Sequence, residues 1–335
     1  MPAQAYSLVA VAAAQALPNG VLTYNSRGSQ LQQCTHVNAP YGQLDSISCT
    51  GTGFNGPLML AAEVQPDALI LDSSFDSALA VAADHYPWLP VSWLLKDTYR
   101  ADLAACVRGE PVSARWSGVF TALQKQIQAH DLPPPLLEDL LSAFEQDVHT
   151  TNAARWYTTH DELHDYCRRS ANPIGRLLLH LYGVRDDAAL QMSDAICTAL
   201  QLINFWQDLS QDIPRGRYYL PLDTLASHGL TTADILTLQD TPNTMKLIAA
   251  HADNTRATML KGLKLPPQVQ RALRGFDGWR AALELRCVIQ GGLRVLEKIK
   301  AHGYRALSQR PKLNRWDAVV VLWRSLGLRW PPLLG

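Results

Sequence analysis

Two aspartates, Asp208 and Asp212, lie four residues apart in a stretch, residues 190–221, whose apolar residues recur at helical spacing. Asn204 lies four residues before Asp208, and Gln201 lies three residues before Asn204, so the four side chains are predicted to lie along one helix face. Two like charges one turn apart on a largely apolar helix repel each other and resist burial unless a cation lies between them. Carboxylate oxygens suit Mg²⁺, which typically uses one or two carboxylates, waters and phosphate oxygens.

Two arginines, Arg215 and Arg217, follow this acidic face at once. Arginine binds phosphate through charge-assisted hydrogen bonds, so the pattern predicts a Mg²⁺–diphosphate site at the end of a helix. The alternative is a solvated polar face on an ordinary amphipathic helix, and a bare pair of aspartates favours that alternative. The added glutamine and asparagine, together with the Arg-Gly-Arg-Tyr-Tyr-Leu-Pro tail, favour the site.

The helix that carries these residues is predicted to run to Ile213, because Pro214 and Gly216 then break the pattern. A second strong helix is expected over residues 159–182, with a kink at Pro173 and with Tyr166 on one face. Further helical patterns cover residues 112–148, 230–238, 243–264 and 266–307. No convincing series of strands accompanies them, so the expected fold class is all-α.

Two stretches of the chain carry a resemblance to a known family. The run QLINFWQDLSQDIPRGRYYLP (201–221) is similar to the second aspartate-rich motif of the squalene/phytoene synthase family, and YCRRSANPIG (166–175) resembles its other hallmark. HYPWLPVSWLL (85–95) and residues 291–318 look like the bacterial branch that makes hydroxysqualene. The resemblance covers about residues 84–330 and implies an isoprenoid synthase-type helical bundle with a central cavity.

The resemblance also implies roles for individual residues. Mg²⁺ would be bound by Asn204, Asp208 and Asp212, with Gln201 extending this set directly or through water. Diphosphate would be contacted by Arg217 and Tyr219, and also by His85 unless that residue is a capping or packing histidine. Tyr166 would lie in the catalytic cavity and stabilise a carbocation with its ring, the alternative being a buried core tyrosine.

The implied activity is that of a transferase of isoprenoid and hopanoid biosynthesis. In the hydroxysqualene branch the substrate is presqualene diphosphate, water is the terminal nucleophile and no reductant is needed. Farnesyl diphosphate is the related prenyl diphosphate ligand. The rival interpretations are a phytoene synthase-type condensation, a non-catalytic relative that binds prenyl diphosphate, and an all-α membrane-surface protein without a ligand.

One part of the family pattern is missing from this chain. After Leu95, residues 96–106 resemble what normally follows the first aspartate-rich motif, so that motif and its helix are expected to be absent. Asp72 and Asp76 have the required spacing, but they precede His85 and lack a helical context. We therefore expect impaired activity, with these two residues as a weak candidate replacement.

Composition limits the remaining possibilities. Residues 1–80 resemble nothing recognised and are expected to be poorly ordered, whereas residues 84–330 form the family-like domain. The formal net charge is zero, so nucleic acid is not an expected partner. No apolar run is long enough to span a membrane, and six scattered cysteines indicate reduced thiols in the cytoplasm. Residues 286–329 carry ten Lys or Arg with interleaved tryptophans, which favours either peripheral contact with an anionic membrane or a solvated basic face.

Overall fold

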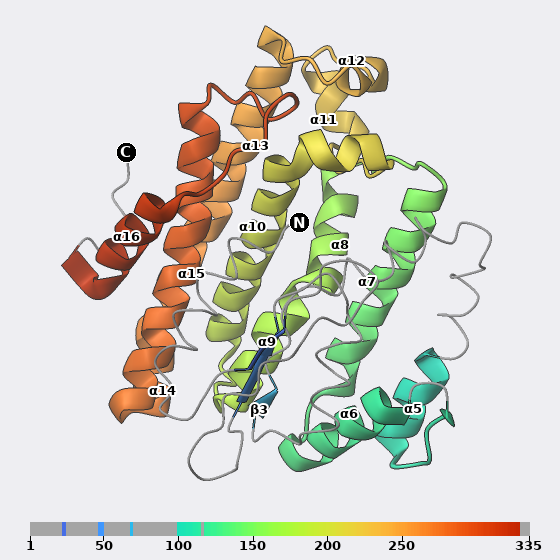
Figure 1. Ribbon diagram of the computed structural model, residues 1–335, viewed down its shortest axis with the longest axis vertical. Helices are drawn as coiled ribbons and strands as arrows, with labels where there is room; N and C mark the ends of the chain where they lie inside the picture. The colour runs from blue at the N-terminus through green and yellow to red at the C-terminus, as the bar shows by residue number, and fades with distance from the viewer. Residues whose placement is uncertain (1–21, 25–45, 50–67, 70–98, 115–116, 329–335) are drawn as a thin grey trace. The chain divides into compact units, whose positions relative to one another are not determined.

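The protein is represented by a computed structural model that describes residues 22–24, 46–49, 68–69, 99–114 and 117–328. It divides after Val148 into two compact units (Figure 1). Three short strands, β1 (Leu22–Tyr24), β2 (Ser46–Cys49) and β3 (Ala68–Leu69), form a parallel sheet in that order within the first unit. Most of residues 1–98, including His85, Asp72 and Asp76, lies outside the described residues.

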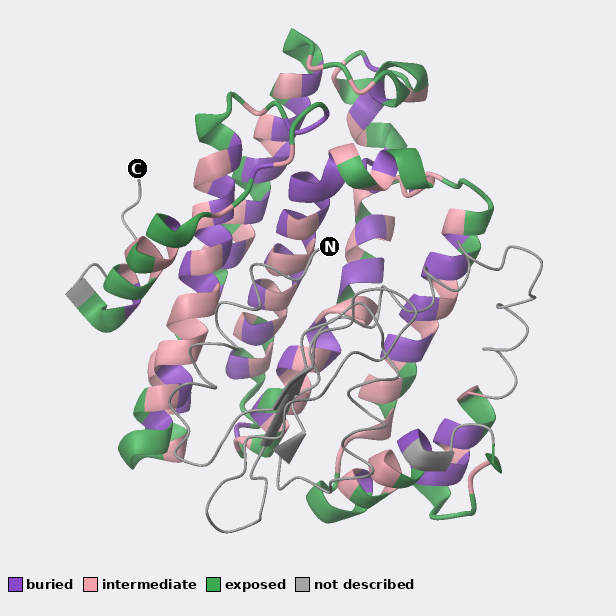
Figure 2. Ribbon diagram, viewed as in Figure 1, coloured by how far each residue is buried: buried purple, intermediate pink, exposed green. Residues whose placement is uncertain are grey.

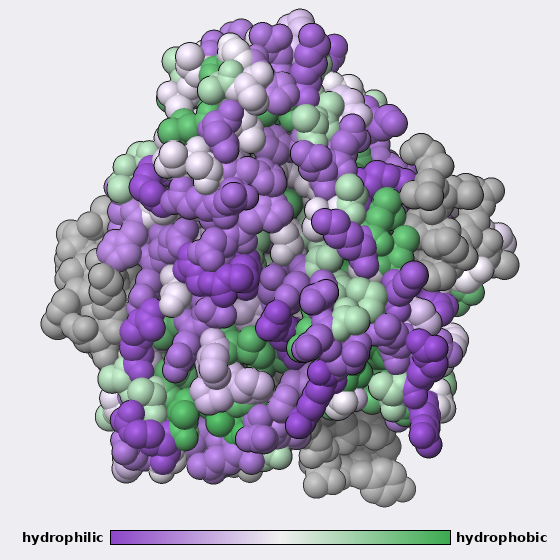
Figure 3. Space-filling view, turned by 180° about the vertical axis from the view of Figure 1, so that it is seen from behind, coloured by the Kyte–Doolittle hydropathy of each residue, from purple (hydrophilic) through white to green (hydrophobic). Residues whose placement is uncertain are grey.

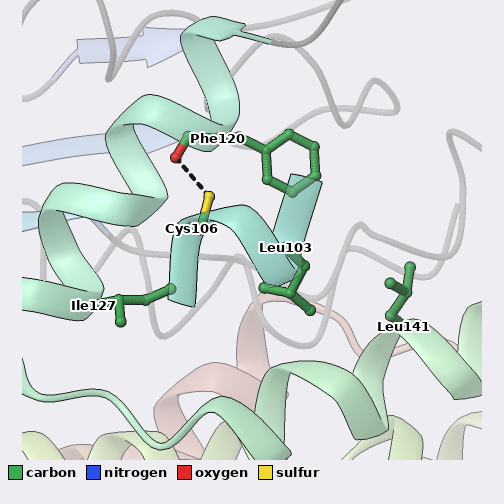
Figure 4. Packing of buried hydrophobic residues seen from close by; sticks show 5 residues of the cluster. All are labelled: Leu103, Cys106, Phe120, Ile127 and Leu141. Carbon is green, nitrogen blue, oxygen red and sulfur yellow. Dashed lines mark hydrogen bonds between the residues drawn. The ribbon is translucent and has the colours of Figure 1, made fainter. Parts of the chain in front are cut away.

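The helices described in the first unit are α5 (Arg100–Arg108), α6 (Ser117–His130) and most of α7 (Pro134–Asn152). Their small core consists of Leu103, Cys106, Phe120, Ile127 and Leu141 (Figure 4). The Cys106 thiol donates a hydrogen bond to the Phe120 carbonyl oxygen at 3.1 Å, and burial raises the pKa of this thiol to about 11. Cys106 is therefore a structural residue and not a nucleophile.

The second unit contains the remaining helices, and α10 (Asp187–Asp212) is the element around which they pack (Figure 1). The helices that pack against it include α8 (His160–Ser170), α9 (Asn172–Leu181), α13 (Pro242–Lys261), α14 (Leu265–Leu273) and α15 (Gly275–Ala301). The others are η3 (Ile213–Arg215), α11 (Leu222–Ser227), α12 (Thr232–Leu236), α16 (Arg315–Trp323) and η4 (Arg324–Leu328). The predicted all-α class is confirmed for the described residues from 99 onward. None of the helices described is long and apolar enough to cross a membrane.

Two glycines allow neighbouring helices to approach α10 closely. A Cβ atom on Gly175 of α9 would lie 2.3 Å from the Ser193 hydroxyl and 2.6 Å from the Cys197 sulfur. A Cβ atom on Gly292 of α15 would lie between 2.9 and 3.1 Å from side chains of α10 and α13. Gly292 therefore permits close packing, whereas a Cβ atom on its neighbour Gly291 would meet nothing within 4 Å.

Two of the predicted helices are interrupted in the structure. The segment 159–182 forms α8 and α9, which meet at Ala171, and Pro173 lies in the first turn of α9, where a proline costs no hydrogen bond. The prediction of one helix over 266–307 is wrong, because Arg274 has φ 57° and separates α14 from α15. A Cβ atom on Gly278 would lie 2.4 Å from the Gln270 carbonyl oxygen, so this glycine permits the tight turn between the two helices.

Candidate functional site

The four polar residues predicted to share a face lie on the C-terminal half of α10, which begins at the Asp186 cap. The Asp208 residue is buried at 8% exposure, while Gln201, Asn204 and Asp212 are partly exposed. Figure 2 shows how much of this helix is buried. A buried carboxylate needs a compensating cation, because an isolated charge away from water is costly.

That cation is supplied by Arg310, a residue far away in the sequence. Its Nε donates to Asp208 Oδ1 at 2.5 Å, and its Nη2 donates to Asp208 Oδ2 at 3.1 Å. The adjacent Gln207 side chain donates to the Pro311 carbonyl oxygen at 2.7 Å, which holds the same segment against α10. Arg310 was not among the predicted site residues, because the sequence indicates only that its region is generally basic.

The chain turns sharply after Asp212. η3 contains Pro214, and Gly216 ends it with φ 75°, as the two helix-breaking residues predicted. The Arg217 N–H then donates to the Asp212 carbonyl oxygen at 3.0 Å. This turn brings the following arginine and the two tyrosines back alongside α10.

The tail after Gly216 is held by stacked aromatic rings. Tyr218 stacks on Trp156 with ring centroids 4.3 Å apart and nearly parallel planes, and the two residues also form a parallel β-bridge. Tyr219 stacks on Phe205 of α10 with centroids 3.8 Å apart. The tail is therefore fixed by side chains on both sides and does not depend on backbone hydrogen bonds alone.

Tyr219 belongs to a buried aromatic cluster with Tyr157, Tyr166 and Phe205. The ring of Tyr166 lies 5.8 to 6.4 Å from the other three, and all four residues are at most 7% exposed. Phe205 precedes Asp208 by three residues, so the aromatic cluster and the carboxylate occupy neighbouring positions on α10. The arrangement places π faces, which attract cations, beside charged groups that suit an anion and its metal.

The structure places seven of the eight predicted site residues on α8, on α10 and on the tail that follows α10: Tyr166, Gln201, Asn204, Asp208, Asp212, Arg217 and Tyr219. The eighth, His85, lies outside the described residues. Tyr157, Phe205 and Arg310 are additional members that the sequence analysis missed. The first two carried only an aromatic signal, and the third is separated from Asp208 by 102 residues.

The donor set on α10 fits Mg²⁺ only as a partial site. Among the described residues, no three His, Cys, Asp or Glu side chains gather in a group able to bind a metal ion. Two carboxylates and an amide are nevertheless sufficient for Mg²⁺ when substrate phosphate oxygens and waters complete its six ligands. Asp208, Asp212 and Asn204 would be the protein ligands of such an ion.

A group of histidines lies next to Trp206, the residue that follows Phe205. The His251 ring stacks on Trp206 with centroids 4.3 Å apart. The centroid of the His160 ring lies 6.1 Å from that of His251 and 4.3 Å from that of His164. Burial, reinforced by His160 and by His228 of the α11 end, lowers the pKa of His251 to about 3. His251 is therefore neutral at physiological pH and acts as a packing group behind the site.

Comparison with known proteins gives a consistent result. A family model described as squalene/phytoene synthase matches residues 70–317. The phytoene synthase of Thermus thermophilus is 27% identical over 237 residues, which are 70% of this chain and 76% of that protein. The hydroxysqualene synthase of Rhodopseudomonas palustris is 29% identical over 205 residues, which are 61% of this chain and only 65% of that protein.

Solved structures show the same relationship. The crystal structure of the squalene synthase HpnC from Alicyclobacillus acidocaldarius matches with a TM-score of 0.58 and 32% identity. The match covers 68% of this chain and 81% of that one. The helices around α10 therefore have the fold of these synthases.

Proposed function

Because the chain belongs to the squalene/phytoene synthase family, whose members are prenyltransferase-type synthases, we propose that it binds a prenyl diphosphate with the C-terminal end of α10. The observation that carries the proposal is the juxtaposition of Asp208 and its partner Arg310 with the buried aromatic cluster. One part suits a metal-bound diphosphate, and the other suits the cation that remains when diphosphate leaves.

We further infer that the substrate is presqualene diphosphate and that the product is hydroxysqualene, the compound in the names of three relatives. Mg²⁺ bound by Asp208, Asp212 and Asn204 would neutralise the departing diphosphate. The arginines Arg217 and Arg310 would bind its oxygens. The rings of Tyr157, Tyr166, Phe205 and Tyr219 would exclude water from the carbocation and stabilise its charge until one water molecule adds.

We expect the rate to be reduced by the missing first aspartate-rich motif. Residues 99–152 contain no two acidic side chains four apart, so α5, α6 and α7 supply no replacement pair. Loss of half of the metal ligands would cost several kcal/mol in the transition state, or roughly 10³-fold in rate. This absence also supports the second candidate, a relative that binds prenyl diphosphate without turning it over.

The test combines binding and turnover. An unreactive thiodiphosphate analogue of farnesyl diphosphate should bind in the presence of Mg²⁺, and the Asp208→Ala/Asp212→Ala variant should lose this binding. Asp194→Ala is the matched control, because Asp194 lies on the same helix and is also paired with an arginine, Arg176. Equal binding by both variants would refute the proposed site.

Turnover with presqualene diphosphate then distinguishes the two candidates. Formation of hydroxysqualene that depends on Asp208 and Asp212 supports the synthase. Binding without any product supports the non-catalytic relative. A product from twenty-carbon diphosphates would instead support a phytoene synthase-type condensation, as in the Thermus relative.

We place the reaction at a membrane surface in the cytoplasm, because the proposed substrate and product carry long apolar chains. The basic character of residues 286–329 supports this location. Several of these cations are nevertheless paired with acids: Arg294 and Lys298 with Asp317, Arg324 with Glu297, and Arg310 with Asp208. The number of Lys and Arg residues in 286–329 therefore overstates the positive charge that this region presents to a membrane.

A further inference from the structure

Helix α16 packs on α15 with the face that carries the buried Asp317, while its large apolar residues Trp316, Leu322 and Trp323 remain exposed. The Asp317 side chain, only 2% exposed, accepts hydrogen bonds from Arg294 of α15 at 2.8 Å and from the Asn314 backbone N–H at 2.8 Å. The Lys298 Nζ lies 3.0 Å from Asp317 Oδ2, and Arg324 of η4 pairs with Glu297 of α15. An amphipathic helix in a globular protein normally does the opposite and buries its apolar stripe.

The apolar side of α16 consequently faces outward. Its exposed residues lie three positions apart, except for the adjacent pair Leu322 and Trp323, and they continue into η4: Trp316 (66% exposed), Val319 (56%), Leu322 (49%), Trp323 (57%) and Leu326 (50%). Figure 2 shows α16 as a largely exposed helix at the edge of its unit. Figure 3 shows that hydrophilic residues predominate on the face that it draws, with hydrophobic residues in smaller areas among them.

The surroundings of this stripe are positively charged. Lys312 and Arg315 are exposed just before or at the start of the helix, and the Arg315 guanidinium lies over the Trp316 ring, 5.6 Å from its centroid. Asp317 is the single acidic residue between positions 300 and 328, and it is buried in ion pairs.

We propose that the outer face of α16 and η4 lies in the headgroup region of a membrane that contains anionic lipids. Tryptophan prefers the interface between water and hydrocarbon because its ring is amphipathic. Anionic headgroups attract the cations nearby. The inference builds on the proposed membrane location of the reaction and names the surface that makes the contact.

A second copy of the chain is a less suitable occupant for this face. A symmetric dimer through the stripe would repeat the same patch on both sides of its axis. Lys312 and Arg315 of one copy would then face the same cations of the other, with no exposed acid in residues 300–328 to offset them. An anionic lipid surface matches both the apolar and the charged parts.

Vesicle co-sedimentation of the full chain, without substrate, tests this proposal. We expect binding to phosphatidylcholine vesicles that contain phosphatidylglycerol, weaker binding to pure phosphatidylcholine, and a decrease with added salt. Trp316→Ser/Trp323→Ser should bind at least about tenfold more weakly, since the lost transfer of two rings exceeds the free energy equivalent of a factor of ten. Phe276→Ser/Trp279→Ser is the matched control, because these two exposed aromatics stack at the start of α15 and should not matter.

The charge is tested in the same assay. Lys312→Gln/Arg315→Gln should weaken binding to the anionic vesicles by about tenfold or more, whereas Lys264→Gln/Arg271→Gln at α14 should leave it unchanged. Unchanged binding by the α16 variants would overturn the proposal. The proposal would also be overturned if the parent chain did not bind vesicles but formed a concentration-dependent dimer, measured by analytical ultracentrifugation, that the α16 variants had lost. No substrate is present in these assays, so neither result decides whether the protein is a synthase.

Discussion

Removal of the Arg310 side chain should destabilise the protein, because it leaves the Asp208 carboxylate buried without its guanidinium. The two side chains are only 14% and 12% exposed, and two hydrogen bonds join them. Loss of one partner from a buried ion pair costs about 3–5 kcal/mol, and the slight exposure here favours the lower end, about 3 kcal/mol. We expect this loss in Arg310→Met, measured as the free energy of unfolding in urea.

The double variant Asp208→Asn/Arg310→Met should recover part of this loss, because an amide is much cheaper to bury than an unpaired carboxylate. The expected coupling free energy from the double-mutant cycle is about 1–3 kcal/mol. The pair Arg176–Asp194 provides the control on the same helix. Its side chains are 40% and 21% exposed, so the corresponding cycle should give about 1 kcal/mol or less.

Additive effects of the two substitutions at positions 208 and 310 would refute the reasoning. They would show that Arg310 does not compensate the buried charge of Asp208. A coupling no larger than that of the Arg176–Asp194 control would lead to the same conclusion.

Two further predictions concern packing and pH. Gly292→Ala should lower the free energy of unfolding by about 1–3 kcal/mol, because the new methyl group overpacks against α10 and α13, whereas Gly291→Ala should be neutral or stabilising, and urea titrations of both variants check this. His251 has a pKa of about 3 when folded and about 6.5 when unfolded, so the unfolded chain takes up its proton first as the pH falls. Its contribution to stability should be complete above pH 6.5 and should decrease toward pH 3 with a slope of at most about 1.4 kcal/mol per pH unit. His251→Gln should flatten the pH profile of unfolding, and an unchanged profile would contradict this assignment.

The parts of the site that follow from local spacing were predictable from the sequence. The positions of Asp208 and Asp212 on one face and the turn at Gly216 depend on residues at most a few positions apart. Side chains on the same helix face have fixed relative positions once the helix forms. For that reason a single stretch of sequence already contained most of the candidate metal ligands.

The parts that depend on tertiary contacts were not predictable. Nothing near Arg310 in the sequence distinguishes it from the other arginines of residues 286–329, and only the fold brings it to Asp208. The division at Arg274 was missed because the apolar periodicity continues through both α14 and α15. The inverted packing of α16 was missed because the partners of Asp317 lie mainly on another helix.

The segment between α15 and α16 connects the candidate site with the proposed membrane surface. Asp240 accepts hydrogen bonds from the backbone N–H groups of Leu307 and Ser308, and Arg310 binds Asp208. Four residues after Arg310, Asn314 caps the start of α16. Since this segment is fixed at each of these points within one compact unit, the outward face of α16 has a defined direction relative to the end of α10. Attachment through that face would therefore orient the diphosphate site relative to the lipid, which is the arrangement needed by an enzyme that takes an apolar chain from the membrane and holds its charged end in water.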